Sequence, residues 1–556
     1  MDVIRKYALI NAVEYQGTAS AKAVMGKVMG ESPDLRRDPG RTLELIEKEI
    51  SEINKMTRDE QTRELERIFP EYFEKGEVKK KELPPLPQAE NVDKVVTRLP
   101  PEPNGFPHLG HGLSFYFNYY YARRYGGKVI LRFDDTNPDK EKLEFYDEMK
   151  KGITWLKIDW DEEHYESNDL PLLYRYAEKL IRQGNAYICF CPQPKIKQDR
   201  YSMKECDCRK RTIPENLQSW EEMLSGKKHI VRLKGDMASP DSQMRDPTLL
   251  RVVLTPHPIQ KDTYRVWPTY DFACAIEDSV LGVTHVLRSN EFHTALQNHI
   301  RDLLKLRHPL IIQYSRFNVR GSPASKRQLR PLIAKNLVEG WDDIRLTTLR
   351  ALKRRGIVPE TIHALAVEMG LSTSEPLIDW SIIEALNRKI IDAQTKRYFF
   401  VPDPVELCVE NAPEMTVHLR FHPDKDYGTR EIKTAKTFFI PKADIHDEFR
   451  LKDLFNVAVT ERKDSRLIGV FTGREVKKGL EKIQWVTETH VPVTVLVPHQ
   501  LFVDGEFNPE SLEIIKGFGE EAVGTLCVDE IIQFERFGFC RIDETGKEIT
   551  ACFAHR

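Results

Sequence analysis

The sequence predicts a multidomain protein organised around an α/β domain. Residues 94–137 alternate strand-like and helix-like stretches, residues 1–74 carry apolar side chains at helical spacing, and beyond about residue 401 short β-rich runs alternate with turns. The length of 556 residues accommodates about three to five domains at roughly 150 residues each. We therefore expect a central Rossmann-type α/β domain, with an all-α appendage before it and β-barrels after it.

Residues 94–137 define the character of the central domain. A β-branched run at 95–97 stops at a loop rich in Pro and Gly, and the loop opens into an aromatic-rich helix expected over 110–125. A second strand is expected over 129–133. The order strand, loop, helix, strand is that of a parallel α/β unit, in which ligands bind beyond the carboxyl ends of the strands and at helix N-termini.

His108 and His111 stand at the entry to this helix and are three residues apart, so both imidazoles reach the same face. Gly110 between them lets a flat group approach the backbone. Imidazoles placed in this way can donate hydrogen bonds to the oxygens of an α-phosphate as it becomes pentacoordinate. The alternative is a pair of surface histidines beside a Pro/Gly turn.

The other segments follow in chain order. A Lys-rich and Pro-rich connector at 75–88 ends the helical start, and an amphipathic helix is expected over 170–184. A strand over 310–315 precedes a basic segment, 326–400, that reads as helical, including residues 341–356. The expected domains are the N-terminal helical appendage with its linker (1–83), the first half of the Rossmann-type domain (84–188), an inserted cysteine-rich region (189–262), the second half (263–330), a helical region (331–400) and the β-barrels (401–556).

Composition excludes an integral membrane protein. Charged residues make up 31% of the chain, the longest nearly unbroken apolar run covers only residues 491–497, and the N-terminal residues lack a basic-then-apolar export pattern. We therefore expect a cytoplasmic protein. The net charge of −2 neither supports nor excludes nucleic-acid binding. Residues 320–355, however, hold ten Lys or Arg against three acids, and this local positive charge favours nucleic-acid binding.

Four of the nine cysteines lie close together, as Cys189, Cys191, Cys206 and Cys208. An odd total in a cytoplasmic chain argues against a disulfide framework. Two close pairs of thiolates separated by a short loop can close a tetrahedral Zn²⁺ site, and four thiolates leave no open position for a reacting water, so the site would be structural. The alternative is four free thiols in a metal-free loop.

A second phosphate-binding candidate lies about 215 residues after the histidines, at the end of the same predicted domain. Ser325, Lys326 and Arg327 follow a Gly-Ser-Pro loop. A lysine there can neutralise the β- and γ-phosphates of ATP as pyrophosphate leaves, together with Mg²⁺. A three-residue motif alone does not indicate phosphate binding. Its position at the end of the predicted α/β domain is what supports that role.

The two motifs, HLGH and SKR, resemble the HIGH and KMSKS signatures of class I aminoacyl-tRNA synthetases. The chain is similar to the glutamyl/glutaminyl branch, in its archaeal and eukaryotic form, in the strings TRLPPEPNGFPHLGH, LRFDDTNP, YDFACAIEDSVLGVTHVLRSNEF, LNRKIIDAQTKRYFFV and IIQFERFGFCRID. The resemblance covers residues 94–556. One departure, Pro323-Ala324 in place of a bulkier pair before SKR, concerns the mobility of the loop and not the role of Lys326.

The resemblance implies an amino-acid pocket. Arg98 would lie near the substrate carboxylates, Asp134 would receive the α-ammonium, and Tyr270 and Cys274 would line the site. Arg288 would pair with the side-chain carboxylate of glutamate, because an amide would leave its guanidinium unpaired at a cost of about 1–3 kcal/mol. The alternative for both arginines is an ordinary salt bridge. The implied ATP site comprises Glu102, Asn104, His108, Gly110, His111, Ser325, Lys326 and Arg327.

The implied activity is ligation of L-glutamate to tRNA(Glu) through glutamyl-adenylate, with release of AMP and pyrophosphate. The insertion would approach the acceptor end, the basic helical region would contact the inner side of the tRNA, and the barrels would read the anticodon, with Phe534, Phe537 and Phe539 in a barrel core. We expect a monomer, and charging of tRNA(Gln) stays open. The alternatives are a glutaminyl-tRNA synthetase, a non-catalytic tRNA-binding scaffold and a free-standing nucleotidyltransferase.

Overall fold

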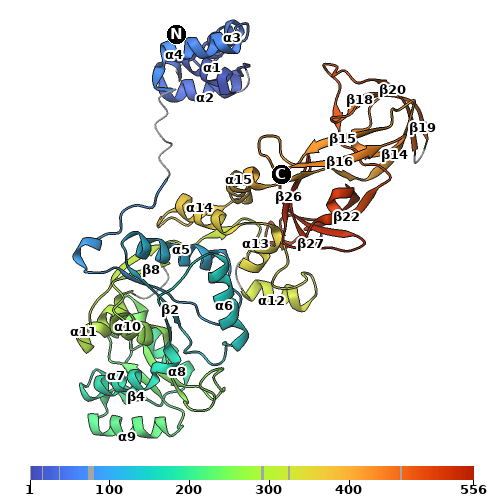
Figure 1. Ribbon diagram of the computed structural model, residues 1–556. Coiled ribbons are helices and arrows are strands. Elements are labelled where there is room, and N and C mark those ends of the chain that lie inside the picture. The colour runs from blue at the N-terminus through green and yellow to red at the C-terminus, as the bar shows by residue number, and fades with distance from the viewer. Residues whose placement is uncertain are drawn as a thin grey trace. The chain divides into compact units, whose positions relative to one another are not determined.

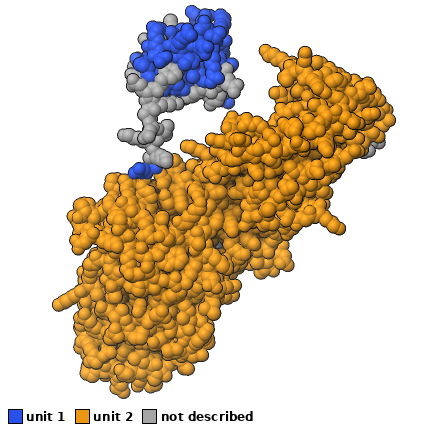
Figure 2. Space-filling view, in the orientation of Figure 1, with its two compact units in different colours: residues 1–82 blue, residues 83–556 orange. Residues whose placement is uncertain are grey.

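The computed structural model describes residues 2–14, 17–36, 38–72, 81–289, 294–322, 326–463 and 466–556. The chain forms two compact units, residues 1–82 and residues 83–556, which Figure 2 shows in different colours. Among the described residues, no helix combines the length and the apolar character needed to span a bilayer.

The first unit is all-α, as expected. Its helices are α1 (Asp2–Glu14), α2 (Ala21–Glu31), α3 (Pro39–Ile53) and α4 (Arg58–Ile68). In α3 the buried residues Ile46, Ile50 and Ile53 recur every three or four positions, so they form one apolar stripe in a core that also contains Leu9 and Leu65. This stripe gives the unit a core of its own.

The second unit contains the predicted α/β domain (Figure 1). Its central strands are parallel: β1 (Val96–Leu99), β2 (Lys128–Phe133) and β3 (Glu162–Tyr165) pair in that order, and β8 (His285–Ser289) pairs with β9 (Leu310–Tyr314). The Thr284 N–H donates to the Val96 carbonyl, so β8 lies beside β1. The strand, loop, helix, strand order predicted for residues 94–137 is confirmed.

The two faces of this sheet carry different side chains. Leu99, Leu131 and Phe133 join a core with α5 (Leu109–Arg124) and α6 (Leu143–Trp155). Side chains alternate along a strand, so Arg98 and Arg132 lie on the opposite face. There both contact one acidic side chain, Asp278, of α10 (Tyr270–Val280).

An antiparallel sheet interrupts the α/β alternation. Its strands follow the order β4 (Ala186–Cys189), β5 (Ile230–Leu233), β6 (Thr248–Val252) and β7 (Val266–Pro268). The predicted amphipathic helix is α7 (Leu170–Arg182), and α8 (Gln193–Tyr201) and α9 (Ile213–Leu224) lie within the insertion. The chain then returns to the parallel sheet through α10, β8 and α11 (Thr294–Leu304).

The basic region is helical, with one exception. Its helices are α12 (Lys326–Ala334), α13 (Leu349–Arg355), α14 (Pro359–Met369) and α15 (Trp380–Ile391), and the short strands β10 (Asn318–Val319) and β11 (Leu377–Ile378) pair beside them. The helix expected over residues 341–356 is wrong in its first half. The Asp343 carboxylate accepts the Arg345 N–H and guanidinium, and the Thr348 hydroxyl accepts the Ala351 N–H, so turns occupy the segment and the helix begins after Thr348.

Two sheets of near-barrel form complete the chain, as the fold class predicted. One contains β12 (Arg397–Tyr398), β13 (Phe400–Pro402), β22 (His490–Pro498), β25 (Leu512–Glu520), β26 (Ile531–Phe534), β27 (Gly538–Glu544) and β28 (Ile549–His555). The other contains β14 (Pro404–Glu410), β17 (Thr437–Pro441), β18 (Glu448–Leu451), β19 (Asn456–Lys463), β20 (Arg466–Gly473) and β21 (Lys482–Ile483). Two-stranded ribbons are formed by β15 (Met415–Arg420) with β16 (Thr429–Thr434) and by β23 (Phe502–Val503) with β24 (Glu506–Phe507).

Two of the three aromatic residues expected in a barrel core lie there. Phe534 is buried in that core and Phe537 packs against it, so these two predictions are confirmed. Phe539 is also buried, but in a separate cluster with Ala554 and with Ile391 of α15.

Candidate functional site

The paired histidines cap the first helix of the α/β domain. His108 is the N-cap of α5, and its Nδ1 accepts the Gly110 N–H at 3.1 Å, while the His108 N–H donates to His111 Nδ1 at 3.3 Å. The ring centroids are 4.0 Å apart, so the two imidazoles share one face, as predicted. A Cβ on Gly110 would lie 3.0 Å from His108 Cε1, so a side chain there would press against the His108 ring.

These backbone contacts determine where the imidazole protons are. An Nδ1 that accepts a hydrogen bond carries no proton, so each neutral ring carries its proton on Nε2. Nε2–H is therefore the group through which His108 and His111 can donate to a phosphate oxygen. The sequence predicted hydrogen-bond donors at these two positions, and the capping geometry identifies Nε2 as the donor atom of each ring.

The predicted amino-acid ligands lie at or near the carboxyl ends of adjacent strands. Arg98 on β1 is fully buried and its Nε lies 3.1 Å from Asp278 Oδ1. Asp134 directly follows β2 and accepts from Arg132 Nε at 2.9 Å. Burial raises the pKa of Asp134 above its ordinary value, although Arg132 opposes the shift.

Tyr270 and Cys274 come from the first turns of α10. Tyr270 opens the helix, and the buried Cys274 thiol lies 3.5 Å from Asp134 Oδ2. Burial raises the pKa of Cys274 well above its ordinary value, so the side chain is a neutral thiol. The structure thus brings Cys274 and Asp134 together, as the resemblance implied.

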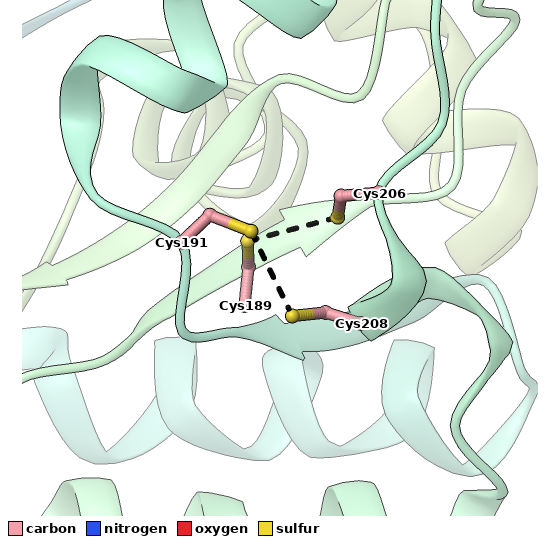
Figure 3. Close-up of side chains that lie close together, drawn as sticks. All are labelled: Cys189, Cys191, Cys206 and Cys208. Atoms are coloured by element: carbon pink, nitrogen blue, oxygen red, sulfur yellow. Dashed lines mark hydrogen bonds between the residues drawn. The ribbon is translucent and has the colours of Figure 1, made fainter.

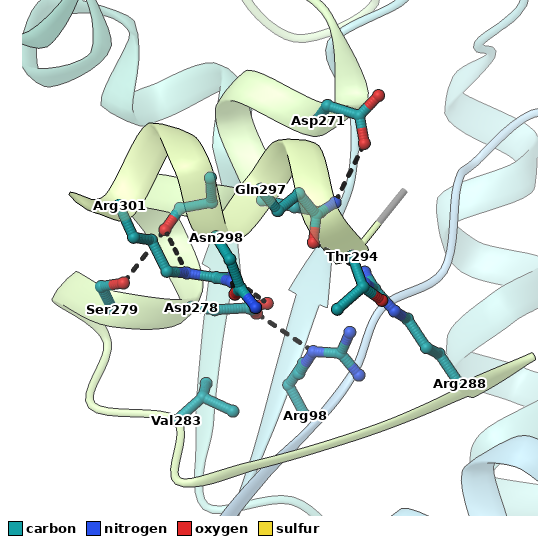
Figure 4. Close-up of polar contacts among 12 residues, drawn as sticks. Arg98, Asp271, Asp278, Ser279, Val283, Arg288, Thr294, Gln297, Asn298 and Arg301 are labelled. Atoms are coloured by element: carbon teal, nitrogen blue, oxygen red, sulfur yellow. Dashed lines mark hydrogen bonds and ion pairs between the residues drawn. The ribbon is translucent and has the colours of Figure 1, made fainter. Parts of the chain in front are cut away.

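Arg288 lies on β8, the strand beside β1, and is 4% exposed. Its Nη1 donates to Gln297 Oε1 and its Nη2 donates to Thr294 Oγ1, both at 2.7 Å, and both partners belong to α11 (Figure 4). These two acceptors fix the orientation of the guanidinium. Such an arrangement suits an arginine that meets an anionic ligand.

Sequence reasoning missed three buried charged residues beneath this site. Arg132 bridges Asp134 and Asp278, and its Nε lies 3.4 Å from Glu166 Oε1. Glu166 follows β3 as Asp134 follows β2, and burial raises its pKa well above the ordinary value. The signal was Arg132 itself, a charged residue inside the otherwise apolar strand 129–133.

The structure describes only some of the remaining residues that are predicted to bind ATP. Glu102 and Asn104 lie in the loop after β1, half-buried, where the Asn104 N–H donates to the Glu102 carbonyl. Ser325 lies outside the described residues. Lys326 and Arg327 begin α12, and their side chains also lie outside what the structure describes. The predicted role of Lys326 stays a prediction.

The four clustered cysteines converge on one point (Figure 3). Their sulfur atoms all lie within 4.8 Å of one another, and the Cys189–Cys206 and Cys191–Cys208 Sγ pairs are each 3.9 Å apart. Sulfurs at about 2.3 Å from a central tetrahedral Zn²⁺ would be about 3.8 Å apart, so the spacing fits this ion.

A buried cation accompanies these thiols. Arg232 Nη1 lies 3.7 Å from Cys206 Sγ and 3.9 Å from Cys189 Sγ. Four thiolates around Zn²⁺ carry a net negative charge, which a guanidinium at this distance offsets. The donor set, its spacing and its neighbouring charge therefore all fit a closed structural metal site.

Comparison with known proteins shows that the whole chain is similar to one family of enzymes. The model of "tRNA synthetases class I (E and Q), catalytic domain" matches residues 94–393, and two models of the anti-codon binding domain of the same class match residues 395–471 and 482–543. A glutamate–tRNA ligase of Pyrococcus abyssi is 41% identical over 99% of both chains. Those of Thermococcus kodakarensis and Nitrosopumilus maritimus are each 39% identical over 100% of this chain and 99% of theirs.

Proposed function

The chain belongs to the glutamate and glutamine branch of the class I tRNA synthetases, and from that premise we propose that it joins L-glutamate to tRNA(Glu) at the expense of ATP. The observation that carries the choice of amino acid is Arg288, a buried guanidinium that Gln297 and Thr294 orient at the end of a strand beside Arg98. A substrate carboxylate offers this group two acceptor oxygens and a negative charge, whereas an amide offers one acceptor oxygen and no charge.

In the first step the α-carboxylate of glutamate attacks the α-phosphorus of ATP, and pyrophosphate leaves. The Nε2–H groups of His108 and His111 donate to the α-phosphate as charge accumulates on its oxygens, which lowers the barrier without a general base. Lys326 would neutralise the departing phosphates. Mg²⁺ that arrives with ATP supplies further positive charge to the phosphates.

In the second step the 2′-hydroxyl of the terminal tRNA ribose takes the glutamyl group, and AMP leaves. During both steps Asp134 would hold the α-ammonium and Arg98 a substrate carboxylate. Tyr270 and Cys274 would line the pocket, where a neutral thiol is a suitable surface because it does not compete for the ammonium.

The C-terminal sheets support a role in tRNA binding. A cavity of about 430 Å³ at these sheets is lined by four cations, Arg397, Arg420, Arg430 and Lys452, and by two acids, Asp453 and Glu535. Lys452 pairs with Glu535 and Arg430 pairs with Glu520. A cavity of this size beside Arg397 and Arg420 fits an unstacked nucleotide and its phosphate. We expect the enzyme to act as a cytoplasmic monomer, with salt-sensitive affinity for tRNA.

The function is tested by charging assays with both amino acids and both tRNAs. We expect ATP–pyrophosphate exchange that depends on glutamate in the presence of tRNA(Glu), and stable glutamyl-tRNA(Glu) as product. Exchange that depends on glutamine alone would identify a glutaminyl enzyme. The same assay shows whether tRNA(Gln) is a second acceptor.

A Lys326→Ala variant tests the alternative that the protein binds tRNA without catalysing a reaction. It should keep tRNA binding and lose most exchange, because it removes a charge from the leaving phosphates. A variant that charged tRNA as fast as the wild type would contradict the assignment of Lys326.

We also propose that Cys189, Cys191, Cys206 and Cys208 bind a structural Zn²⁺. Elemental analysis of the purified protein should give about one zinc per chain. A Cys208→Ser variant should contain less than about half that amount and unfold at a lower temperature, because a structural zinc contributes directly to folding. Cys527→Ser, which alters an exposed cysteine outside the cluster, is the matched control. Wild-type protein with less than about half an equivalent of metal would contradict the proposal.

A further inference from the structure

Asp278 is a buried carboxylate where three arginines converge. It lies on α10 and is fully buried. Its Oδ1 is 3.1 Å from Arg98 Nε and 2.7 Å from Arg132 Nη1, and its Oδ2 is 3.4 Å from Arg301 Nη2. The three arginines come from β1, β2 and α11, so one acidic side chain connects two strands and two helices. Figure 4 shows Asp278 with two of them, Arg98 and Arg301.

The charge of this cluster requires Asp278 to be ionised. Burial opposes ionisation, yet Arg98, Arg132 and Arg301 keep the pKa of Asp278 below its ordinary value. Burying a guanidinium group in turn costs folding free energy unless a carboxylate pairs with it. Removing the Asp278 charge would therefore leave several buried cations together, and these would repel one another.

Asp278 also determines how Arg98 is oriented. Arg98 Nε donates to Asp278, and Arg98 Nη1 points to the Leu287 carbonyl on β8 at 3.5 Å. Figure 4 shows the terminal nitrogens of Arg98 turned away from Asp278. Because two separate acceptors act on different nitrogens, the plane of the guanidinium cannot rotate freely. Its remaining edge faces a fixed direction relative to Arg288 on the neighbouring strand.

We propose that Asp278 is a positioning residue for the amino-acid pocket, which holds Arg98 charged and in the orientation that receives a carboxylate of glutamate. The proposal rests on the proposed function, in which Arg98 binds the amino acid. Asp278 does not itself touch substrate. The competing explanation is an ion pair that only packs α10 onto the sheet, and the two explanations differ in what they predict for substrate affinity.

The test compares Asp278→Asn with Arg301→Gln in tRNA-dependent ATP–pyrophosphate exchange. Asp278→Asn should raise the KM for glutamate about tenfold or more and leave the KM for ATP within about twofold, because Arg98 loses the charge that orients it. Arg301→Gln removes another member of the cluster but leaves the Arg98–Asp278 contact in place. It should therefore change the KM for glutamate by less than about threefold.

A second variant keeps the proposal testable if Asp278→Asn does not fold. Asp278→Glu preserves the charge and moves the carboxylate by one methylene, so it should fold and give a smaller rise in the KM for glutamate. A wild-type KM for glutamate in either folded variant, equal rises for glutamate and ATP, or an equal rise in Arg301→Gln would overturn the proposal. Failure of the wild type to use glutamate would instead overturn the proposed function, so the two failures can be told apart.

Discussion

A His108→Asn variant is expected to lose about a hundredfold or more of its exchange rate, at a stability close to that of the wild type. Asparagine is among the best N-cap residues, and its side-chain oxygen can replace Nδ1 as the acceptor of the Gly110 N–H. It does not reach as far as Nε2. The variant therefore removes the donor to the α-phosphate while it preserves the cap of α5.

His108→Ala is the matched comparison, since it removes both the cap and the donor. It should lose exchange to a similar extent and also about 1 kcal/mol of stability. Exchange rates at saturating substrates and the free energy of unfolding in denaturant would be measured for both variants. If His108→Asn kept more than about a third of the wild-type rate, His108 would be a helix cap and not a donor in the transition state.

The features predicted correctly from sequence depend on residues that are close together in the chain. The helix expected over 110–125 is observed at Leu109–Arg124, and the shared face of His108 and His111 follows from their spacing of three residues. The convergence of the four thiols likewise depends on a single short stretch of chain, from the end of β4 through α8 to Cys208. In each case local geometry decides the outcome.

The features that sequence reasoning missed depend on how distant elements pack. Asp278 and Arg132 lie in stretches that read as an ordinary helix and an apolar strand. Nothing local indicates that three guanidinium groups from β1, β2 and α11 reach one carboxylate, because this depends on the packing of α10 against the sheet. The segment before Thr348 was misread for a related reason: Asp343 bonds locally to Arg345, and hydrophobic spacing does not reveal such a competitor for helical hydrogen bonds.

Arg288→Gln is expected to abolish most use of glutamate, with a fall in kcat/KM of about a hundredfold to a thousandfold. The substitution removes the only positive charge that the proposal assigns to the side-chain carboxylate, and glutamate would have to bury that carboxylate beside a neutral amide. Glutamine carries no such charge, so its kcat/KM should not fall in parallel. The quantity to measure is the ratio of the two kcat/KM values in tRNA-dependent exchange.

Arg288→Lys separates the charge of Arg288 from its geometry. A lysine keeps the positive charge but cannot donate from two fixed nitrogens to Gln297 and Thr294, so α11 would no longer orient it. Its kcat/KM for glutamate should therefore lie between those of wild type and Arg288→Gln, with glutamate still preferred over glutamine. If Arg288→Gln reduced the use of both amino acids equally, Arg288 would support the structure of β8 and α11 without selecting the substrate, and the choice of glutamate over glutamine would have to come from another residue.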